Sequence, residues 1–180
     1  TWLGAAMGNA QSKNYQVLNN TAYTVANFRT AIIGGNFNSS FNGSSSGWSS
    51  VYGTWSLVSS AYYKTAGAPG YFASTKHTGT YGDLTYTVRM KRGSSDPTRP
   101  NYIVIRGNPA SLAANKLWNS SYIFGYSNDG TFAVLRMNAN GTYTILKTWT
   151  ASTAIVQGGW NTLKVVAVGT ALKYYINNVL

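Results

Sequence analysis

Hydrophobic and polar residues alternate with a period of two along most of the chain from about residue 50 to its end. In the clearest case, residues 84–91, four apolar side chains alternate with two threonines, an arginine and a lysine. Successive side chains of a strand point to opposite faces, so this pattern puts all the apolar ones on one face. The sequence therefore predicts an all-β protein in which most strands bury one side. The continuous apolar run Tyr102–Ile105 is instead expected to form a strand buried on both faces.

Turn dipeptides separate the predicted strands. Asp129-Gly130 and Asn140-Gly141 tolerate the positive φ angles of tight hairpins. The strands are expected at Gly53–Val58, Ala61–Lys64, Tyr71–Ser74, Leu84–Lys91, Tyr102–Ile105, Tyr122–Tyr126, Thr131–Met137, Thr142–Trp149, Thr162–Val168 and Ala171–Ile176. Short strands at such spacing indicate a two-sheet antiparallel sandwich of the jelly-roll kind.

One short segment is typical of a helix. Asn108 could cap it and Pro109 suits the first helical position, with alanines and leucines following. We therefore expect a single short helix over residues 109–117, crossing between strands.

The chain divides into two parts that differ in how regularly hydrophobic and polar residues alternate. Residues 1–35 are expected to form an N-terminal arm with strands near Tyr15–Leu18 and Tyr23–Ile33, and residues 36–180 form the jelly roll. Residues 38–50, rich in serine, glycine and asparagine, are interpreted as a loop.

Composition points to the cell exterior. Charged residues are only 9% of the chain, against about 25% in an ordinary soluble domain, and polar uncharged residues and tyrosine take their place. Cysteine is absent, which excludes disulfides and thiolate metal sites. No apolar run reaches the ~20 residues that span a bilayer. We expect an extracellular or cell-surface protein, and the net charge of +11 favours anionic partners.

Several motifs resemble the concanavalin A-like, laminin G-type jelly rolls. They are Phe37 with Gly47-Trp48, the stretch Gly53–Val58, Tyr81–Val88, Gly159–Val166 and Leu172–Leu180. The resemblance covers about residues 36–180 and implies a two-sheet sandwich. It also implies a choice among that superfamily's roles, which include glucanases, lectins, carbohydrate-binding modules and adhesion domains.

Catalysis is not expected. The glycosidases of the superfamily need two acidic residues on one strand, whereas this chain has no glutamate and only Asp83, Asp96 and Asp129, which are dispersed. His77 is the only histidine and is interpreted as a surface-loop residue, which leaves neither a nucleophile–base pair nor a transition-metal site. We therefore predict a non-catalytic protein that is not an enzyme and has no cofactor.

Two kinds of binding residue are candidates. Asn128 and Asp129 are a weak calcium site, although a hairpin turn explains both residues and one carboxylate is poor for Ca²⁺. The candidates for glycan contact are Trp118, expected in a loop, and Tyr63, Tyr175 and Arg106. Tyrosines are also common on sheet surfaces because of their strand propensity alone.

Five sequons are candidate glycosylation sites, which would make the chain a glycoprotein. They are Asn19, Asn38, Asn42, Asn119 and Asn140. A chain this rich in Asn, Ser and Thr also forms such triplets by chance.

Two functions remain open. In the family pattern further strands follow residue 176, so a sheet is expected to end with an unpaired edge, which residues 1–35 could fill in cis or in a neighbouring copy. The first function is a structural subunit of a surface assembly or filament that self-assembles through residues 1–35 and the C-terminal edge. The alternative is a lectin-like module that binds anionic or neutral polysaccharide. Nucleic acid is not an expected partner.

Overall fold

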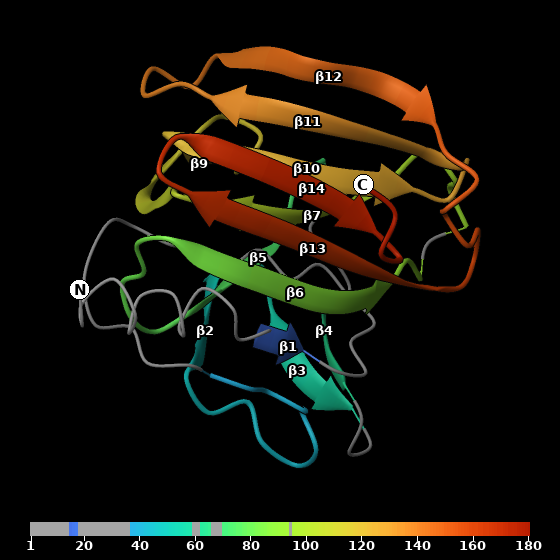
Figure 1. Cartoon of the computed structure of the whole chain (residues 1–180). Helices are drawn as coiled ribbons and strands as arrows, with labels where there is room; N and C mark the ends of the chain where they lie inside the picture. The colour runs from blue at the N-terminus through green and yellow to red at the C-terminus, as the bar shows by residue number, and fades with distance from the viewer. Residues whose placement is uncertain (1–14, 18–36, 59–61, 66–69, 94) are drawn as a thin grey trace, which may run out of the picture.

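The computed structural model describes residues 15–17, 37–58, 62–65, 70–93 and 95–180, and the regular structure in these ranges is all β (Figure 1). The strands are β1 Tyr15–Val17, β2 Trp48–Tyr52, β3 Trp55–Val58, β4 Tyr62–Thr65, β5 Ser74–His77, β6 Leu84–Lys91, β7 Pro100–Ile105, β8 Asn108–Leu112, β9 Trp118–Asn119, β10 Ser121–Ser127, β11 Thr131–Met137, β12 Tyr143–Ala151, β13 Trp160–Val168 and β14 Ala171–Ile176. No helix in the described ranges is long and apolar enough to cross a membrane.

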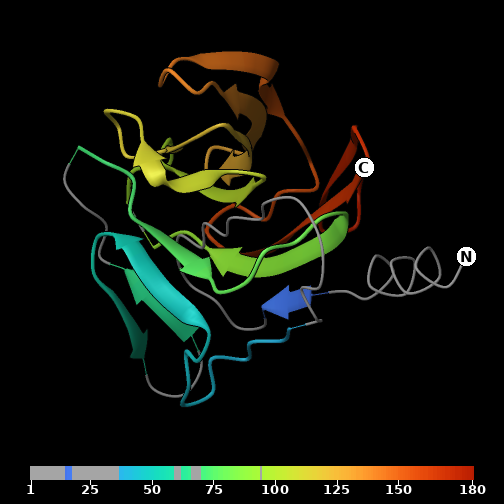
Figure 2. The same cartoon turned by 90° about the vertical axis from the view of Figure 1, so that its left-hand side faces the viewer.

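Two four-stranded sheets carry the main core. One has the order β1-β6-β13-β14 and the other β12-β11-β10-β7, with β2–β5, β3–β4 and β8–β9 as smaller pairs (Figures 1 and 2). Both sheets contribute to one cluster of buried side chains, such as Tyr86 and Val165 from the first and Ile103 and Phe124 from the second. Leu57 and Phe132 are partly buried and pack against this cluster. The all-β prediction is confirmed.

The strands with the strongest sequence pattern form where they were expected. β6 pairs antiparallel with β13, Tyr86 opposite Val165, and its apolar side chains are completely covered. β7 is buried at all six positions, and these include the apolar run Tyr102–Ile105 that was expected to be buried on both faces. Gly130 and Gly141 adopt φ angles of 85° and 83° at the two predicted hairpin turns. Local pattern and tertiary packing agree in these strands.

The predicted helix over residues 109–117 is wrong. The segment instead forms β8, a turn and β9, with Leu112 opposite Trp118. Asn108 does accept a hydrogen bond from a following amide, but it closes a turn onto Ala110 (3.2 Å) rather than capping a helix. Lys116 has a φ of 70°, which a right-handed helix excludes. Helix propensity is a weak preference, and packing of the Trp118 side chain in the core overrides it.

Residues 38–50 are not entirely loop, because β2 begins at Trp48 and pairs with β5. The predicted strand at Tyr71–Ser74 is displaced, since β5 begins only at Ser74. His77 is also not a loop residue: it ends β5, where its ring stacks on Phe37 with centroids 3.8 Å apart. Burial lowers the His77 pKa, although a hydrogen bond to the Thr78 carbonyl oxygen works against this.

Part of the N-terminal arm pairs within its own chain. β1 lies parallel to β6, with Tyr15 opposite Tyr86. It is the edge strand of this sheet and pairs with the side of β6 that faces away from β13 (Figure 1). The expected strand near Tyr23–Ile33 lies outside the described residues.

Candidate functional site

An open groove of about 310 Å³ lies on the face of the β12-β11-β10-β7 sheet that points away from the main core. A second buried cluster, which includes Val104, Ile123 and Met137, underlies this face. The groove is lined by Phe72, Tyr102, Asn115, Leu117, Ala133, Leu135, Met137, Tyr143, Ile145, Lys147, Thr148 and Trp149. Its residues therefore come from three strands (β7, β11 and β12), from the turn between β8 and β9, and from Phe72 just before β5.

Strand β12 forms the exposed wall of the groove. It is an edge strand with β11 as its neighbour, and the paired register shifts twice along it, as at β-bulges. Tyr143, Ile145 and Trp149 remain 59%, 54% and 42% exposed. Exposed apolar side chains that lie together often mark a binding surface, which makes this wall a candidate one.

The floor of the groove depends on Gly125. This residue of β10 lies opposite Tyr102 of β7. A Cβ atom on Gly125 would overlap the Tyr102 ring and lie 2.5 Å from the Asn101 carbonyl oxygen, so the ring is seated where only glycine leaves room. Tyr102 also packs edge-on against Phe72, with centroids 5.3 Å apart. Burial raises the Tyr102 pKa, so the phenol stays neutral at physiological pH.

The turn between β8 and β9 forms the opposite wall. Asn115 holds the turn in place, because its side-chain oxygen accepts a hydrogen bond from the Leu117 amide (3.1 Å) and its backbone carbonyl accepts one from the Phe72 amide (3.1 Å). Behind the turn, the fully buried Trp118 indole donates a hydrogen bond to Ser74 Oγ (2.9 Å).

The groove combines aromatic rings with a few polar groups. Asn115, Lys147 and Thr148 offer hydrogen-bond donors and acceptors beside the apolar floor. Among the described residues that line it, none is an acidic residue, a histidine or a cysteine. This chemistry suits a ligand that has both an apolar face and hydroxyl groups.

The glycan-contact residues chosen from the sequence do not line this groove. Trp118 and Tyr63 were expected to face outward, but they are 0% and 5% exposed, because both pack in the core. Tyr175 is half-buried on β14, with Lys164 Nζ 4.2 Å from its ring centroid. Arg106 has a φ of 52° and an ion pair with Asp83 (3.5 Å). The prediction that Trp118 lies in an exposed loop is therefore wrong.

The calcium candidates are engaged in a hairpin. Asp129 Oδ1 accepts hydrogen bonds from Ser127 Oγ (2.5 Å), Thr131 Oγ1 (2.7 Å) and the Thr131 amide (3.0 Å). Burial tends to raise the Asp129 pKa, but these hydrogen bonds hold it below its usual value. Asn128 Oδ1 accepts from the Gly158 amide (3.3 Å). Within the described ranges, no three His, Cys, Asp or Glu residues gather as metal ligands would.

The sequons differ in accessibility. Asn38, Asn42 and Asn140 are exposed. Asn119 is buried, and its side-chain amide, the group that would carry a glycan, donates a hydrogen bond to Ser111 Oγ (3.0 Å). Asn19 lies outside the described residues.

Comparisons with known proteins gave no match. No family model fits the chain, and no curated protein or solved structure is similar to it. The concanavalin A-like resemblance therefore stays a prediction from the sequence.

Two signals in the sequence could have pointed to the groove. Gly125 interrupts an otherwise apolar strand, and such a glycine often marks a close approach of neighbouring atoms. Ile145 and Leu146 are adjacent in the sequence, so a strand that contains them has apolar side chains on both faces. Such a strand has more apolar surface than one sheet face can cover.

Proposed function

We propose that this protein is a non-catalytic carbohydrate-binding module of the cell exterior, and that its two main sheets form a jelly-roll sandwich of the concanavalin A-like kind. The observation that carries the proposal is the groove beside β12, where exposed Trp149 and Tyr143 rings stand next to a buried apolar floor. The extracellular composition of the chain supports the same function.

The geometry suggests how a sugar chain would lie. The flat rings of Trp149 and Tyr143 would stack on the apolar faces of pyranose units, and Asn115, Thr148 and Lys147 would form hydrogen bonds with their hydroxyls. Trp149 lies six positions after Tyr143, which is at most about 20 Å along a strand. A groove of this length suits an oligosaccharide segment rather than a single sugar.

The test compares three alanine variants against a panel of soluble polysaccharides by affinity electrophoresis and calorimetry. Trp149→Ala and Tyr143→Ala should each raise Kd about fivefold or more, since truncation of an aromatic anchor commonly costs over ~1 kcal/mol. Tyr175→Ala is the control, because Tyr175 lies on β14 in the other sheet. Loss of binding in the control but not in the groove variants would reject the groove, and absence of any polysaccharide binding would reject the function.

Self-assembly into a surface layer or filament by strand complementation is the second candidate. Strand β12 favours it, because its nine residues are mostly exposed and Leu146 (50% exposed) is apolar outside the groove lining. An edge of this kind can add a strand from another molecule. The other sheet also ends in an edge strand, β14.

Leu146→Lys separates the two candidates. It places a charge on the β12 edge, so it should abolish concentration-dependent assembly in sedimentation and electron microscopy while leaving the groove lining unchanged. A wild-type chain that remains monomeric at all accessible concentrations would eliminate the structural role.

A further inference from the structure

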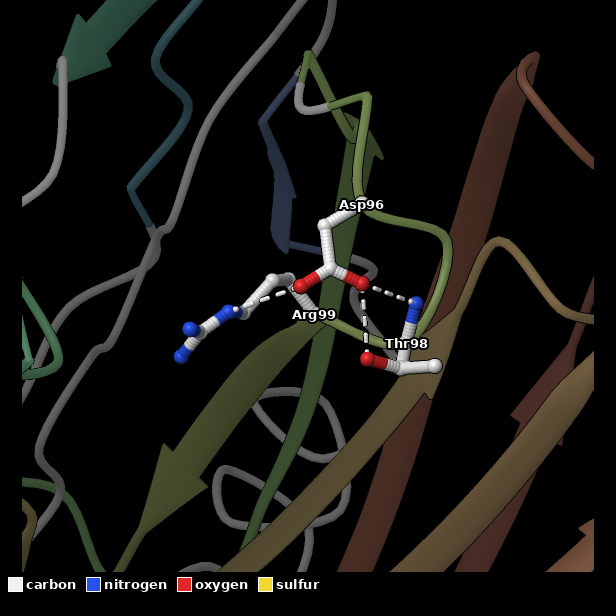
Figure 3. Close-up of polar contacts among 3 residues, drawn as sticks. All are labelled: Asp96, Thr98 and Arg99. Carbon is white, nitrogen blue, oxygen red and sulfur yellow. Dashed lines mark hydrogen bonds and ion pairs between the residues drawn. The ribbon is translucent and has the colours of Figure 1, made fainter.

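The charge of the groove is not balanced by a carboxylate of this chain. The chain has three acidic residues, and each is engaged elsewhere. Asp83 contacts Arg106 and accepts a hydrogen bond from the Gly169 amide (2.8 Å). Asp96 accepts from Thr98 and from Arg99 Nε (3.1 Å), as Figure 3 shows. Asp129 is held within its own hairpin.

One lysine is in the groove lining, and another directly follows a lining residue in the chain. Lys147 lines the groove from β12 and is exposed. Lys116 follows the lining residue Asn115, and its Nζ lies 5.4 Å from the ring centroids of both Tyr52 and Tyr71. These two cation–π contacts and the φ of 70° restrict where the Lys116 ammonium group can lie. Lys147 therefore places one positive charge in the groove lining, and Lys116 follows the lining residue Asn115 in the chain.

We infer that the ligand of this groove is an acidic polysaccharide, whose sugars carry carboxylate or sulfate groups. This inference rests on the proposed carbohydrate-binding function. Aromatic rings would bind the sugar faces, while Lys147 would contact an anionic substituent. The net charge of +11 adds a long-range attraction that raises the rate of encounter with a polyanion.

The distribution of charge disfavours nucleic acid as the occupant. A phosphate backbone is recognised by a track of several lysines or arginines, because each neutralises one phosphate. Of the residues that the structure describes, one lysine and no arginine line this groove.

Two pairs of polymers test the inference, because within each pair only the charge differs. Polygalacturonate is compared with its fully methyl-esterified form, and dextran sulfate with dextran, by calorimetry at low and at 0.5 M salt. The first pair tests carboxylates and the second sulfates. The wild-type protein should bind at least one acidic polymer several-fold more tightly than its neutral counterpart, and high salt should remove most of the difference.

Variants then locate the effect. Lys147→Gln should weaken binding of the acidic polymer about two- to fivefold, the range for one exposed ion pair, and leave the neutral polymer unaffected. Lys147→Arg should retain the preference. Lys173→Gln is the matched control, because Lys173 is exposed on β14 and its loss lowers the net charge equally.

The outcomes separate the two proposals. Equal affinity for the acidic and neutral members of both pairs overturns the acidic ligand but leaves carbohydrate binding intact. An equal effect of Lys147→Gln and Lys173→Gln also overturns it, since net charge alone would then explain the preference. Single-stranded DNA that binds as tightly as the polysaccharides, with the same dependence on Lys147, would assign the groove to nucleic acid. If no polymer binds, the proposed function fails as well.

Discussion

Replacement of Gly125 by alanine should destabilise the fold and distort the groove together. The added methyl group would lie 2.5 Å from the Asn101 carbonyl oxygen and overlap the Tyr102 ring. Tyr102 lines the groove, so a displaced ring would alter the groove lining. The carbonyl oxygen belongs to β7, whose residues are all buried and paired with β10, so it could move only by breaking that pairing.

The expected magnitude follows from this crowding. Overpacking a buried site by one methyl group costs about 1–3 kcal/mol, and contact with backbone places Gly125→Ala near the upper value. For a chain of this size, each kcal/mol lowers Tm by roughly 2–4 °C, so the melting temperature should fall by about 6–12 °C. Because Tyr102 lies on the groove floor, polysaccharide affinity at a temperature where the variant is folded should fall too.

Gly93→Ala supplies the matched control. A Cβ atom there would meet no described atom within 4 Å, and Gly93 does not have a positive φ angle. The same chemical change should therefore be neutral, or stabilise by about 0.4–1 kcal/mol. Thermal unfolding followed by circular dichroism measures both variants. If the Tm of Gly125→Ala lies within about 1 °C of the wild-type value, the close contact between Gly125 and residues 101–102 of β7 would be refuted.

Three further predictions concern stability. Burial lowers the His77 pKa, so the unfolded chain takes up the proton first as pH falls below 6.5. Stability should be full above that pH and decline until the folded-state pKa is passed, whereas His77→Gln should show a flat profile between pH 5 and 8 in urea titrations. Ser74→Ala removes the hydrogen-bond acceptor of the buried Trp118 indole, which should lower the free energy of unfolding by about 1–3 kcal/mol in urea titrations. An unchanged urea midpoint would contradict this hydrogen bond. Deletion of residues 1–35 removes β1 and exposes the edge of β6. Light scattering should then show aggregation, and calorimetry should show a lower Tm. A truncated chain that is monomeric and has an unchanged Tm would count against a role for the arm.

Much of the fold was accessible from the order of residues alone. The alternation over 84–91 predicted β6 with its correct boundaries, and the apolar run of β7 predicted a strand buried on both faces. Asp129-Gly130 and Asn140-Gly141 marked two hairpins correctly. These features are local, because a strand's period and a turn's φ angles depend on residues that are near one another in the chain.

Local sequence patterns could not predict that residues 109–117 are extended rather than helical, nor which aromatic residues are exposed for binding. Residues 109–117 have helical propensity, but Trp118 packs against a distant part of the chain and donates a hydrogen bond to Ser74, which holds the segment extended. The same contact buries Trp118, so composition could not reveal that this aromatic residue is structural while Trp149 is exposed.

The sequence by itself determined that the chain is all-β, where most strands and turns lie, and that its charge is strongly positive. Only the tertiary structure decided which aromatic side chains are exposed, that β12 is an edge, and that Tyr102 lies across Gly125 to form a floor. The physical reason is that exposure depends on which strands become neighbours. That choice is made by side chains up to dozens of residues apart, and no local pattern records it.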